Sequence, residues 1–369
     1  MSENQQKSTV AVDVQFVYSL LSAAVSMRAS DIHITQGKPV YLRIDGRLVV
    51  LPDAGIWEKY HIKAFLTLLK IPDAFAQNNS VNTSFTLNGT RFRFHGYRSL
   101  TGVSIALRTI PLEIPNFDDL HLPESIKTLL RARKGLVLVT GPTGSGKSTT
   151  LASFVNEVNK DSNETKNIVT VENPVEFLYE EINARINQRE VGRNVASFSD
   201  AIIDAVREDP DIVVLGELPD HDSIQNALTL AETGHLVLAT LHTNGAAETF
   251  DRILDAFPGT KHDQVRAQLA NSLQGIINQQ LVPLKGGGRA PVIEYLTLED
   301  PSIRQKLRHA SDVQSIGAIL NESKGGVISR KRSVALLVHK NLISLDEAAE
   351  YASVSKEDIQ RIVNSLRNS

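Results

Sequence analysis

One glycine-rich segment constrains the fold more than any other part of this 369-residue chain. The residues Gly141-Pro-Thr-Gly-Ser-Gly-Lys-Ser148 match G-x-x-x-x-G-K-[ST], the pattern of a phosphate-binding loop. An apolar β-type run, Gly135–Thr140, precedes this loop, and a helix-forming stretch, residues 148–159, follows it. Strand, loop and helix in this order are the context that the motif requires. The chain is therefore expected to bind a nucleoside triphosphate.

The residue types in this loop suit phosphate chemistry. Glycines let the backbone bend and approach phosphate oxygens without a Cβ, and the N–H groups that open the next helix attract anions. Lys147 is expected to place its charge on the β- and γ-phosphates of ATP, and the Ser148 hydroxyl to bind Mg²⁺. The predicted nucleotide-binding residues of the loop are Gly141, Pro142, Thr143, Gly144, Ser145, Gly146, Lys147, Ser148 and Thr149.

The composition narrows the class of protein. A net charge of −3 gives no general attraction to nucleic acid, and an apolar share of 41% supports ordinary globular cores. Because the chain has no cysteine, disulfides, Cys-based zinc sites and thiol catalysis are excluded. The polar N-terminus and the absence of a long apolar run predict no signal peptide and no membrane-spanning helix. We expect a cytoplasmic ATP-using protein that reaches a membrane only through partners.

The order of predicted elements divides the chain into four parts. Residues 1–111 are expected to form an α+β domain with an antiparallel sheet, because helical patterns alternate with short strand pairs and turn signals. The proline-containing residues 112–123 predict an interdomain linker and hinge. Over residues 124–285, apolar strand-like runs alternate with helical stretches, as in a parallel sheet with crossover helices. Residues 286–369 are expected to form a helical C-terminal subdomain.

Polar side chains follow three of the predicted parallel strands. Glu217 follows one strand, where a carboxylate reaches Mg²⁺ or the attacking water in phosphate-loop enzymes. Glu172 and Glu176 follow another, and either acid is able to polarise water or, alternatively, only caps a turn. His242 follows a third strand, where an imidazole senses phosphate or bonds to water. Because parallel strands carry ligands at their carboxyl ends, we expect these groups beside the phosphate loop.

Arginines of the first domain are candidates for a second set of phosphate contacts. Phosphoryl transfer commonly uses a guanidinium opposite the γ-phosphate, supplied by the same subunit or by a neighbour. Arg91, Arg93 and Arg98 crowd one predicted hairpin, and Arg108 follows the next strand. We predict nucleotide contacts for Arg93, Arg98 and Arg108, with a solvated basic face as the alternative.

Ordered motifs over nearly the whole chain resemble those of the type IV pilus retraction ATPases, the PilT-like branch of the secretion ATPase superfamily that also contains GspE and PilB. The resemblance runs from about Ser19 to Ala352. Its motifs are the N-terminal signature at residues 28–34 and 43–46, the Walker A loop at 141–148, the Asp box at 171–177, the segments 187–191 and 205–211 that lead into the Walker B strand, and the His box at 233–243.

The resemblance implies a fold, an activity and partners. The implied fold is α/β, with a RecA-like P-loop NTPase domain, a PAS-like N-terminal domain and a helical C-terminal segment. The implied protein is a homohexameric motor that couples Mg²⁺-dependent ATP hydrolysis to type IV pilus retraction and twitching motility, on an inner-membrane platform protein. By motif match, Glu217 is the Walker B acid and binds Mg²⁺ with Ser148, Glu172 activates water, and His242 is the His-box histidine.

The sequence departs from the family pattern in three places. Asn173 stands where the Asp box usually has Asp, and Leu218-Pro219-Asp220 replaces the usual Met-Arg-Asp. Residues 302–308 match the C-terminal retraction motif only loosely. The alternative is therefore an accessory or secretion-system (type II/IV) ATPase that assists a paralogous pilus motor. A nucleic-acid translocase is a weaker alternative, because the chain lacks a basic, aromatic-rich stripe.

Overall fold

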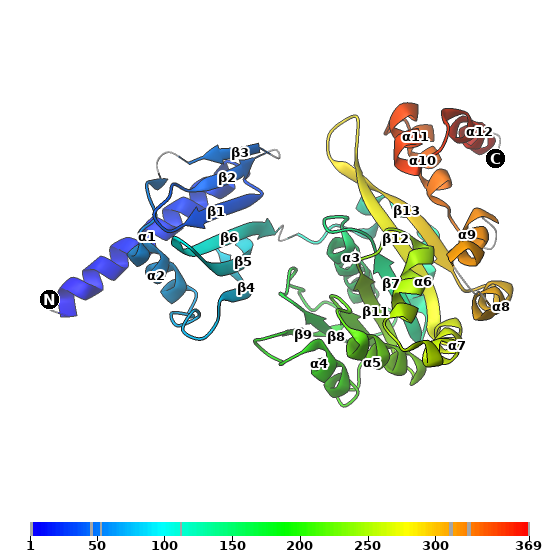
Figure 1. Cartoon of the computed structure of the whole chain (residues 1–369), viewed down its shortest axis with the longest axis horizontal. Helices are drawn as coiled ribbons and strands as arrows, with labels where there is room; N and C mark the ends of the chain where they lie inside the picture. Colours follow the sequence, from blue (N-terminus) through cyan, green and yellow to red (C-terminus); the bar gives the residue numbers. More distant parts are fainter. Residues whose placement is uncertain are drawn as a thin grey trace. The chain divides into compact units, whose positions relative to one another are not determined.

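The chain folds into two compact units (Figure 1). The computed structural model describes residues 3–44, 47–51, 54–110, 113–309, 313–322 and 326–367. The first unit contains Met1–Glu113 together with Asn173–Leu178, and the second contains Ile114–Glu172 and Tyr179–Ser369. The boundary expected between residues 111 and 112 lies outside the described residues.

The first unit is a six-stranded antiparallel sheet with two helices, in the strand order β3-β2-β1-β6-β5-β4. Its elements are α1 (Glu3–Ser26), β1 (Asp31–Thr35), β2 (Tyr41–Ile44), β3 (Arg47–Val50), α2 (Lys59–Leu68), β4 (Ser80–Leu87), β5 (Thr90–Ser99) and β6 (Gly102–Ile110). The strand registers place Leu42, Ile32, Leu107 and Phe94 in one buried row across four strands. Side chains of both helices join this core, which confirms the predicted antiparallel α+β module.

The second unit is built on a seven-stranded sheet in the order β13-β12-β7-β11-β10-β8-β9. Its strands are β7 (Gly135–Thr140), β8 (Asn167–Glu172), β9 (Arg185–Glu190), β10 (Ile212–Leu215), β11 (Leu236–Leu241), β12 (Leu273–Pro283) and β13 (Arg289–Thr297). Its main helices are α3 (Lys147–Lys160), α4 (Phe198–Ala205), α5 (His221–Glu232), α6 (Ala246–Asp255) and α7 (His262–Ser272). All strand pairs are parallel except β12–β13.

Helices cover both faces of this sheet, so its central strands are apolar on both sides. Alternate residues of a strand point to opposite faces. Leu136 and Leu138 of β7 belong to a core with α4 to α7, whereas Val137 and Val139 belong to a core with Phe154 of α3. Burial on both faces explains the continuous apolar runs that predicted these strands.

The sheet extends further along the chain than the sequence indicated. The helical segment begins at Pro301 rather than at residue 286, because the glycine run at 286–288 is the turn of the β12–β13 hairpin. Gly287 and Gly288 have φ values of 87° and 79°, a left-handed backbone that favours glycine. The edge strand β9 was not predicted as a strand either, since only Ile186 of its residues is strongly apolar.

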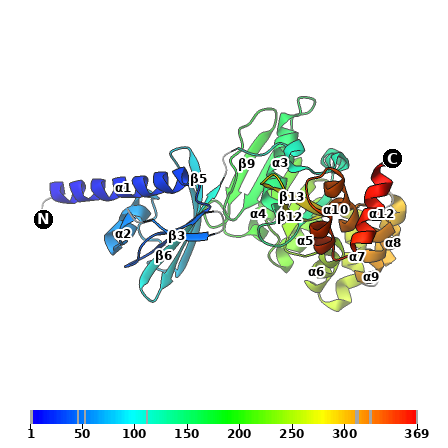
Figure 2. The same ribbon diagram turned by 90° about the horizontal axis from the view of Figure 1, so that it is seen from above.

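The C-terminal segment consists of short helices, α8 (Pro301–His309), α9 (Val313–Glu322), α10 (Arg330–His339), α11 (Leu345–Ala352) and α12 (Lys356–Arg367). The helices α10, α11 and α12 form a small core with Val282, Ala290 and Val292 of the β12–β13 hairpin, and α10 lies against β13 (Figures 1 and 2). Within the described residues, no helix combines the length and the apolarity needed to cross a membrane.

Part of the expected linker packs into the second unit. Phe117 is fully buried and stacks on Phe154 of α3, with ring centroids 5.9 Å apart. Lys127 lies over the Phe117 ring at 4.8 Å, a cation–π contact. Leu122 is buried in the same core. Phe117 and Leu122, within the expected linker at residues 112–123, therefore belong to the packed core of the second unit.

We expect Phe117→Ala to lower the free energy of unfolding of the full-length protein by about 3–5 kcal/mol, the usual cost of truncating a buried aromatic side chain. Urea unfolding followed by circular dichroism measures this loss. Glu113→Ala, at an exposed position, is the control and should change stability by less than about 0.5 kcal/mol. Equal stability of the two variants would mean that Phe117 belongs to a free linker.

Candidate active site

Four adjacent parallel strands of the second unit end at one edge of its sheet. These strands are β7, β11, β10 and β8, in this spatial order. The phosphate loop follows β7, His242 follows β11, Glu217 follows β10, and Glu172 is the last residue of β8. The carboxyl ends of parallel strands are where α/β folds bind ligands. The structure thus brings to one edge the loop and the three predicted strand-end residues.

The phosphate loop is glycine-rich because its backbone requires it. At Gly141, φ is 147° and a Cβ would lie 2.2 Å from the carbonyl oxygen of Gln279, so no side chain fits. Gly146 has a φ of 90° and is the N-cap of α3. The loop is thereby pressed against β12 and leads directly into the helix N-terminus, whose N–H groups favour anions.

A buried glutamine that the sequence did not reveal anchors this loop. The side-chain amide of Gln279 donates to the Ser145 carbonyl oxygen at 2.7 Å, and its oxygen accepts a hydrogen bond from the Thr150 hydroxyl at 2.9 Å. Gln279 therefore bridges the loop and the first turn of α3 from the neighbouring strand. The available signal was a run of three amides, Asn278-Gln279-Gln280, between the apolar pairs Ile276-Ile277 and Leu281-Val282.

Lys147 is held within its own loop. Its ammonium group donates to the carbonyl oxygens of Gly141 at 2.9 Å and Pro142 at 3.0 Å. The same nitrogen lies 3.3 Å from Nδ1 of His242. Burial lowers the pKa of the His242 imidazole, the positive charge of Lys147 lowers it further, and the Glu217 carboxylate opposes both effects. The imidazole beside the loop is therefore neutral at pH 7.

Glu217 lies in a turn that is tied to β11. Gly216 O accepts a hydrogen bond from the Thr240 hydroxyl at 2.5 Å, and the Leu218 N–H donates to the Thr240 carbonyl oxygen at 3.1 Å. Glu217 and His242 line the same cavity of about 290 Å³. These contacts tie the turn that carries Glu217 to β11, the strand that His242 follows.

The residues after Glu217 lead into the next helix. Asp220 is the N-cap of α5, and its carboxylate accepts a hydrogen bond from the Ser223 N–H at 2.8 Å. Leu218 is buried in the core of the second unit. Asp220, which the family pattern shares, thus begins α5, and Leu218 fills the core, whereas no contact among the described residues explains Pro219.

Glu172 and Glu176, which the sequence left as alternatives, lie in different units. Glu172 accepts hydrogen bonds at Oε1 from the Thr170 hydroxyl at 2.7 Å and from the Gln188 amide at 3.3 Å. A Cβ on Gly216 would lie 3.3 Å from Cα of Glu172, so the ends of β8 and β10 are closely packed. Glu176 belongs to the segment that groups with the first unit. Within the second unit, Glu172 lies at the sheet edge that carries the phosphate loop.

The predicted arginines all have contacts within the first unit. Arg91 is buried and donates to the Val175 carbonyl oxygen at 2.7 Å. Arg93 forms an ion pair with Glu176 at 3.2 Å, and both side chains are partly exposed. Arg98 donates to the Phe75 carbonyl oxygen, and Arg108 pairs with Asp31 at 2.9 Å. Nucleotide contact by Arg93, Arg98 and Arg108 stays a prediction.

We expect the His242 imidazole of the nucleotide-free protein to titrate below pH 6.5, and Lys147→Met to raise its pKa by removing the neighbouring cation. Between the lowered pKa and pH 6.5 the unfolded chain binds more protons at this residue than the folded chain. The protein therefore loses stability as the pH falls through that window. NMR titration of the imidazole signals measures both effects.

The signals of His262, whose ring contacts the Phe257 carbonyl oxygen at 3.0 Å, serve as the internal control. At each pH their chemical shifts should be the same in wild type and Lys147→Met. An unchanged His242 midpoint in Lys147→Met would show that the ammonium group and the imidazole are not coupled.

Comparison with known proteins identifies the family. A model of the family described as "Type II/IV secretion system protein" matches residues 5–326. The chain is 38% identical over 341 residues to the type IV pilus retraction ATPase PilT of Pseudomonas aeruginosa, covering 92% of this chain and 98% of that protein. It is 32% identical to the type IV pilus ATPase PilU of the same organism, and this match covers 93% of this chain and 90% of that protein.

A solved structure agrees with these matches. The crystal structure of the pilus retraction motor PilT with bound ADP superposes with a TM-score of 0.82 at 38% identity, over 92% of this chain and 98% of that one. The predicted fold class, a RecA-like ATPase domain with a PAS-like N-terminal domain and a helical C-terminal segment, is confirmed. The chain belongs to the type II/IV secretion system protein family and is one of its nucleotide-binding pilus and secretion ATPases.

Proposed function

We propose that this ATPase drives type IV pilus retraction. The observation that carries the proposal is the convergence of Lys147, Glu217, His242 and Glu172 on one sheet edge, in a chain that aligns over nearly its full length with a retraction ATPase. The working form is a homohexameric ring in the cytoplasm, acting on the pilus platform protein of the inner membrane. A ring is needed because force requires that a neighbouring subunit responds to the nucleotide state.

We assign each residue of the site a role in this reaction. The phosphate loop binds the triphosphate, and Lys147 exchanges its loop carbonyl contacts for the β- and γ-phosphate oxygens. Glu172 is the base that takes a proton from the attacking water; Thr170 and Gln188 orient its carboxylate. His242, neutral and next to Lys147, bonds to the water or the γ-phosphate. Arg93, Arg98 and Arg108 provide further positive charge to the phosphates.

Magnesium fits the oxygen donors of the site. Ser148, in the first turn of α3, offers a hydroxyl, and Glu217 offers a carboxylate. Mg²⁺ prefers hard oxygen ligands and usually completes its shell with phosphate oxygens and water. When bound, the ion would neutralise charge that develops on the phosphate oxygens.

An accessory ATPase is the second candidate. The similarity to PilU also covers most of the chain, at 32% identity. Asn173 removes a carboxylate beside Glu172, and Pro219 replaces a basic residue of the family pattern. An accessory subunit would assist a paralogous pilus ATPase and have little turnover on its own. Steady-state ATP hydrolysis by the isolated protein separates the two functions.

We expect Lys147→Ala to lower ATP turnover by about 100-fold or more, because it removes the loop's only charge on the transferred phosphoryl group. A coupled assay of the purified full-length protein with Mg²⁺ measures the effect. Lys134→Ala, an exposed lysine just before β7, is the matched control and should keep wild-type turnover. Activity retained by Lys147→Ala would overturn the assignment of the site.

Deletion of the gene in the source organism should increase the number of surface pili and abolish twitching motility, since pili would be assembled but not withdrawn. Electron microscopy and a stab-agar motility assay give the two readouts. Complementation with Lys134→Ala should restore the wild-type phenotype, and complementation with Lys147→Ala should not. Loss of surface pili in the deletion strain would instead indicate an assembly motor.

A further inference from the structure

The first turn of helix α10 carries three cations, Arg330, Lys331 and Arg332, and no acid. This is the end of a helix that favours negative charge, so the pattern is locally unfavourable. Ser329 caps the helix by accepting a hydrogen bond from the Arg332 N–H, but it adds no charge. A residue type that is unfavourable at its position in a helix is expected where its side chain has another role in the protein.

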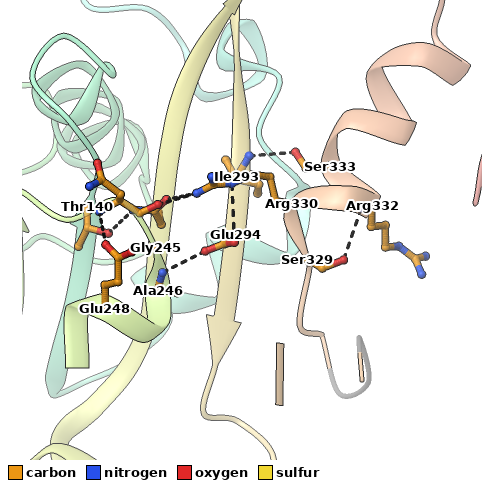
Figure 3. Close-up of polar contacts among 12 residues, drawn as sticks. Thr140, Gly245, Ala246, Glu248, Ile293, Glu294, Ser329, Arg330, Arg332 and Ser333 are labelled. Atoms are coloured by element: carbon orange, nitrogen blue, oxygen red, sulfur yellow. Dashed lines mark hydrogen bonds and ion pairs between the residues drawn. The ribbon is translucent and has the colours of Figure 1, made fainter. Parts of the chain in front are cut away.

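Arg330 joins helix α10 to three other segments of the second unit. Its Nη2 donates to the Asn244 carbonyl oxygen at 2.6 Å and to Oδ1 of Asn278 at 3.1 Å. Its Nε lies 3.7 Å from Oε1 of Glu294, and both side chains are about three-quarters buried, with exposed fractions of 26% and 21%. Figure 3 shows Arg330 reaching toward Glu294 on β13, while Arg332 points away from this cluster.

The Asn278 amide continues the network to the phosphate loop. Its Nδ2 donates to the Thr140 hydroxyl and to the Thr243 carbonyl oxygen, both at 3.0 Å. Thr140 directly precedes Gly141, the first residue of the loop, and Thr243 directly follows His242. Thr140, Asn278 and Thr243 are all buried, so their hydrogen bonds are costly to lose.

Glu294 supports the same turn from its other end. Its Oε2 accepts a hydrogen bond from the N–H of Ala246, the first residue of α6, at 3.1 Å. The N-cap of α6 is Gly245, which has no side chain to do this. Glu294 thus caps α6 from a neighbouring strand, and Arg330 neutralises the charge that this cap brings. Arg330 and Glu294 together hold residues 243–246, the turn that connects His242 to α6.

We propose that Arg330 is a positioning residue of the ATPase reaction, through which the helical C-terminal segment holds the turn after His242. Arg330 has no hydrogen bond to Lys147, Glu217 or His242 among the described contacts, so it acts on them through Asn244, Asn278 and Glu294. Loss of the guanidinium leaves a partly buried carboxylate without its cation and the Asn244 carbonyl without a charged donor. The turn then relaxes, and His242 leaves the geometry that favours the transition state. This inference rests on the proposed binding of ATP at the phosphate loop.

The test compares Arg330→Gln with Arg332→Gln, which removes the same charge from the same helical turn. Turnover of ATP by the full-length protein is measured over a range of ATP concentrations, with the melting temperature of each variant. We expect Arg330→Gln to lower kcat about tenfold while KM changes less than about threefold, because a small misplacement costs the transition state more than substrate binding. Arg332→Gln should have wild-type kcat, KM and melting temperature.

Arg330→Lys should recover part of the lost kcat, because lysine keeps the charge but not the planar fork that serves several acceptors. Wild-type kcat in Arg330→Gln would overturn the proposal. So would a loss of kcat that tracks a lowered melting temperature without recovery in Arg330→Lys, since that marks a purely structural residue.

If Arg330→Gln does not fold, Glu294→Gln decides the question, because its amide oxygen still accepts from Ala246 while the ion pair is gone. The proposal expects a lowered kcat in that variant, and wild-type kcat overturns it. Lys147→Ala, run in parallel, tests the site itself. Activity in Lys147→Ala would contradict the proposed function, whereas a loss there with wild-type activity in Arg330→Gln would contradict only the role of Arg330.

Discussion

The contact between the phosphate loop and strand β12 is the constraint on which the site depends. Gly141 lies so close to the Gln279 carbonyl oxygen that no Cβ fits, and the Gln279 side chain bonds to both Ser145 and Thr150. These contacts within the protein fix the loop between its own strand and the neighbouring one. Such preorganisation is what an electrostatic site needs, because donors already in place cost no reorganisation during the reaction.

The sequence predicted β7, β8, β10 and β11, but not β9, β12 and β13, and the reason is physical. The four predicted strands are buried on both faces and therefore read as unbroken apolar runs. The strand β9 lies at the sheet edge and is mostly polar, and the apolar residues of β12 are interrupted by Asn278, Gln279 and Gln280. Of these amides, Gln279 binds the loop, and Asn278 binds Thr140 and the turn at Thr243. The polar residues that made β12 unrecognisable as a strand therefore include those that support the candidate site.

The residues of the candidate site also divide into those that have a local sequence signal and those that have none. Lys147, Glu217 and His242 could be predicted because a local motif or a strand end marks each of them. Gln279 and Arg330 could not be predicted, because their partners lie far away in the sequence. Gln279 contacts residues more than a hundred positions earlier in the chain, and Arg330 contacts Asn244, which lies 86 positions earlier. What marks such residues in a sequence is a local inconsistency. For Gln279 the inconsistency is an amide run between apolar residues of a strand, and for Arg330 it is a cation in the first turn of a helix.

Under the proposed function, the position of Lys147 links nucleotide binding to the pKa of the His242 imidazole. Its ammonium group bonds to two neutral loop carbonyls and lies 3.3 Å from the imidazole. Hydrogen bonds to charged acceptors are stronger than those to neutral ones, so phosphate oxygens draw Lys147 away from these carbonyls. Its charge is then balanced by phosphate, and the negative oxygens themselves favour a protonated imidazole. Under the proposed function both changes would raise the pKa of His242, so this histidine would respond to phosphate through the lysine that binds it.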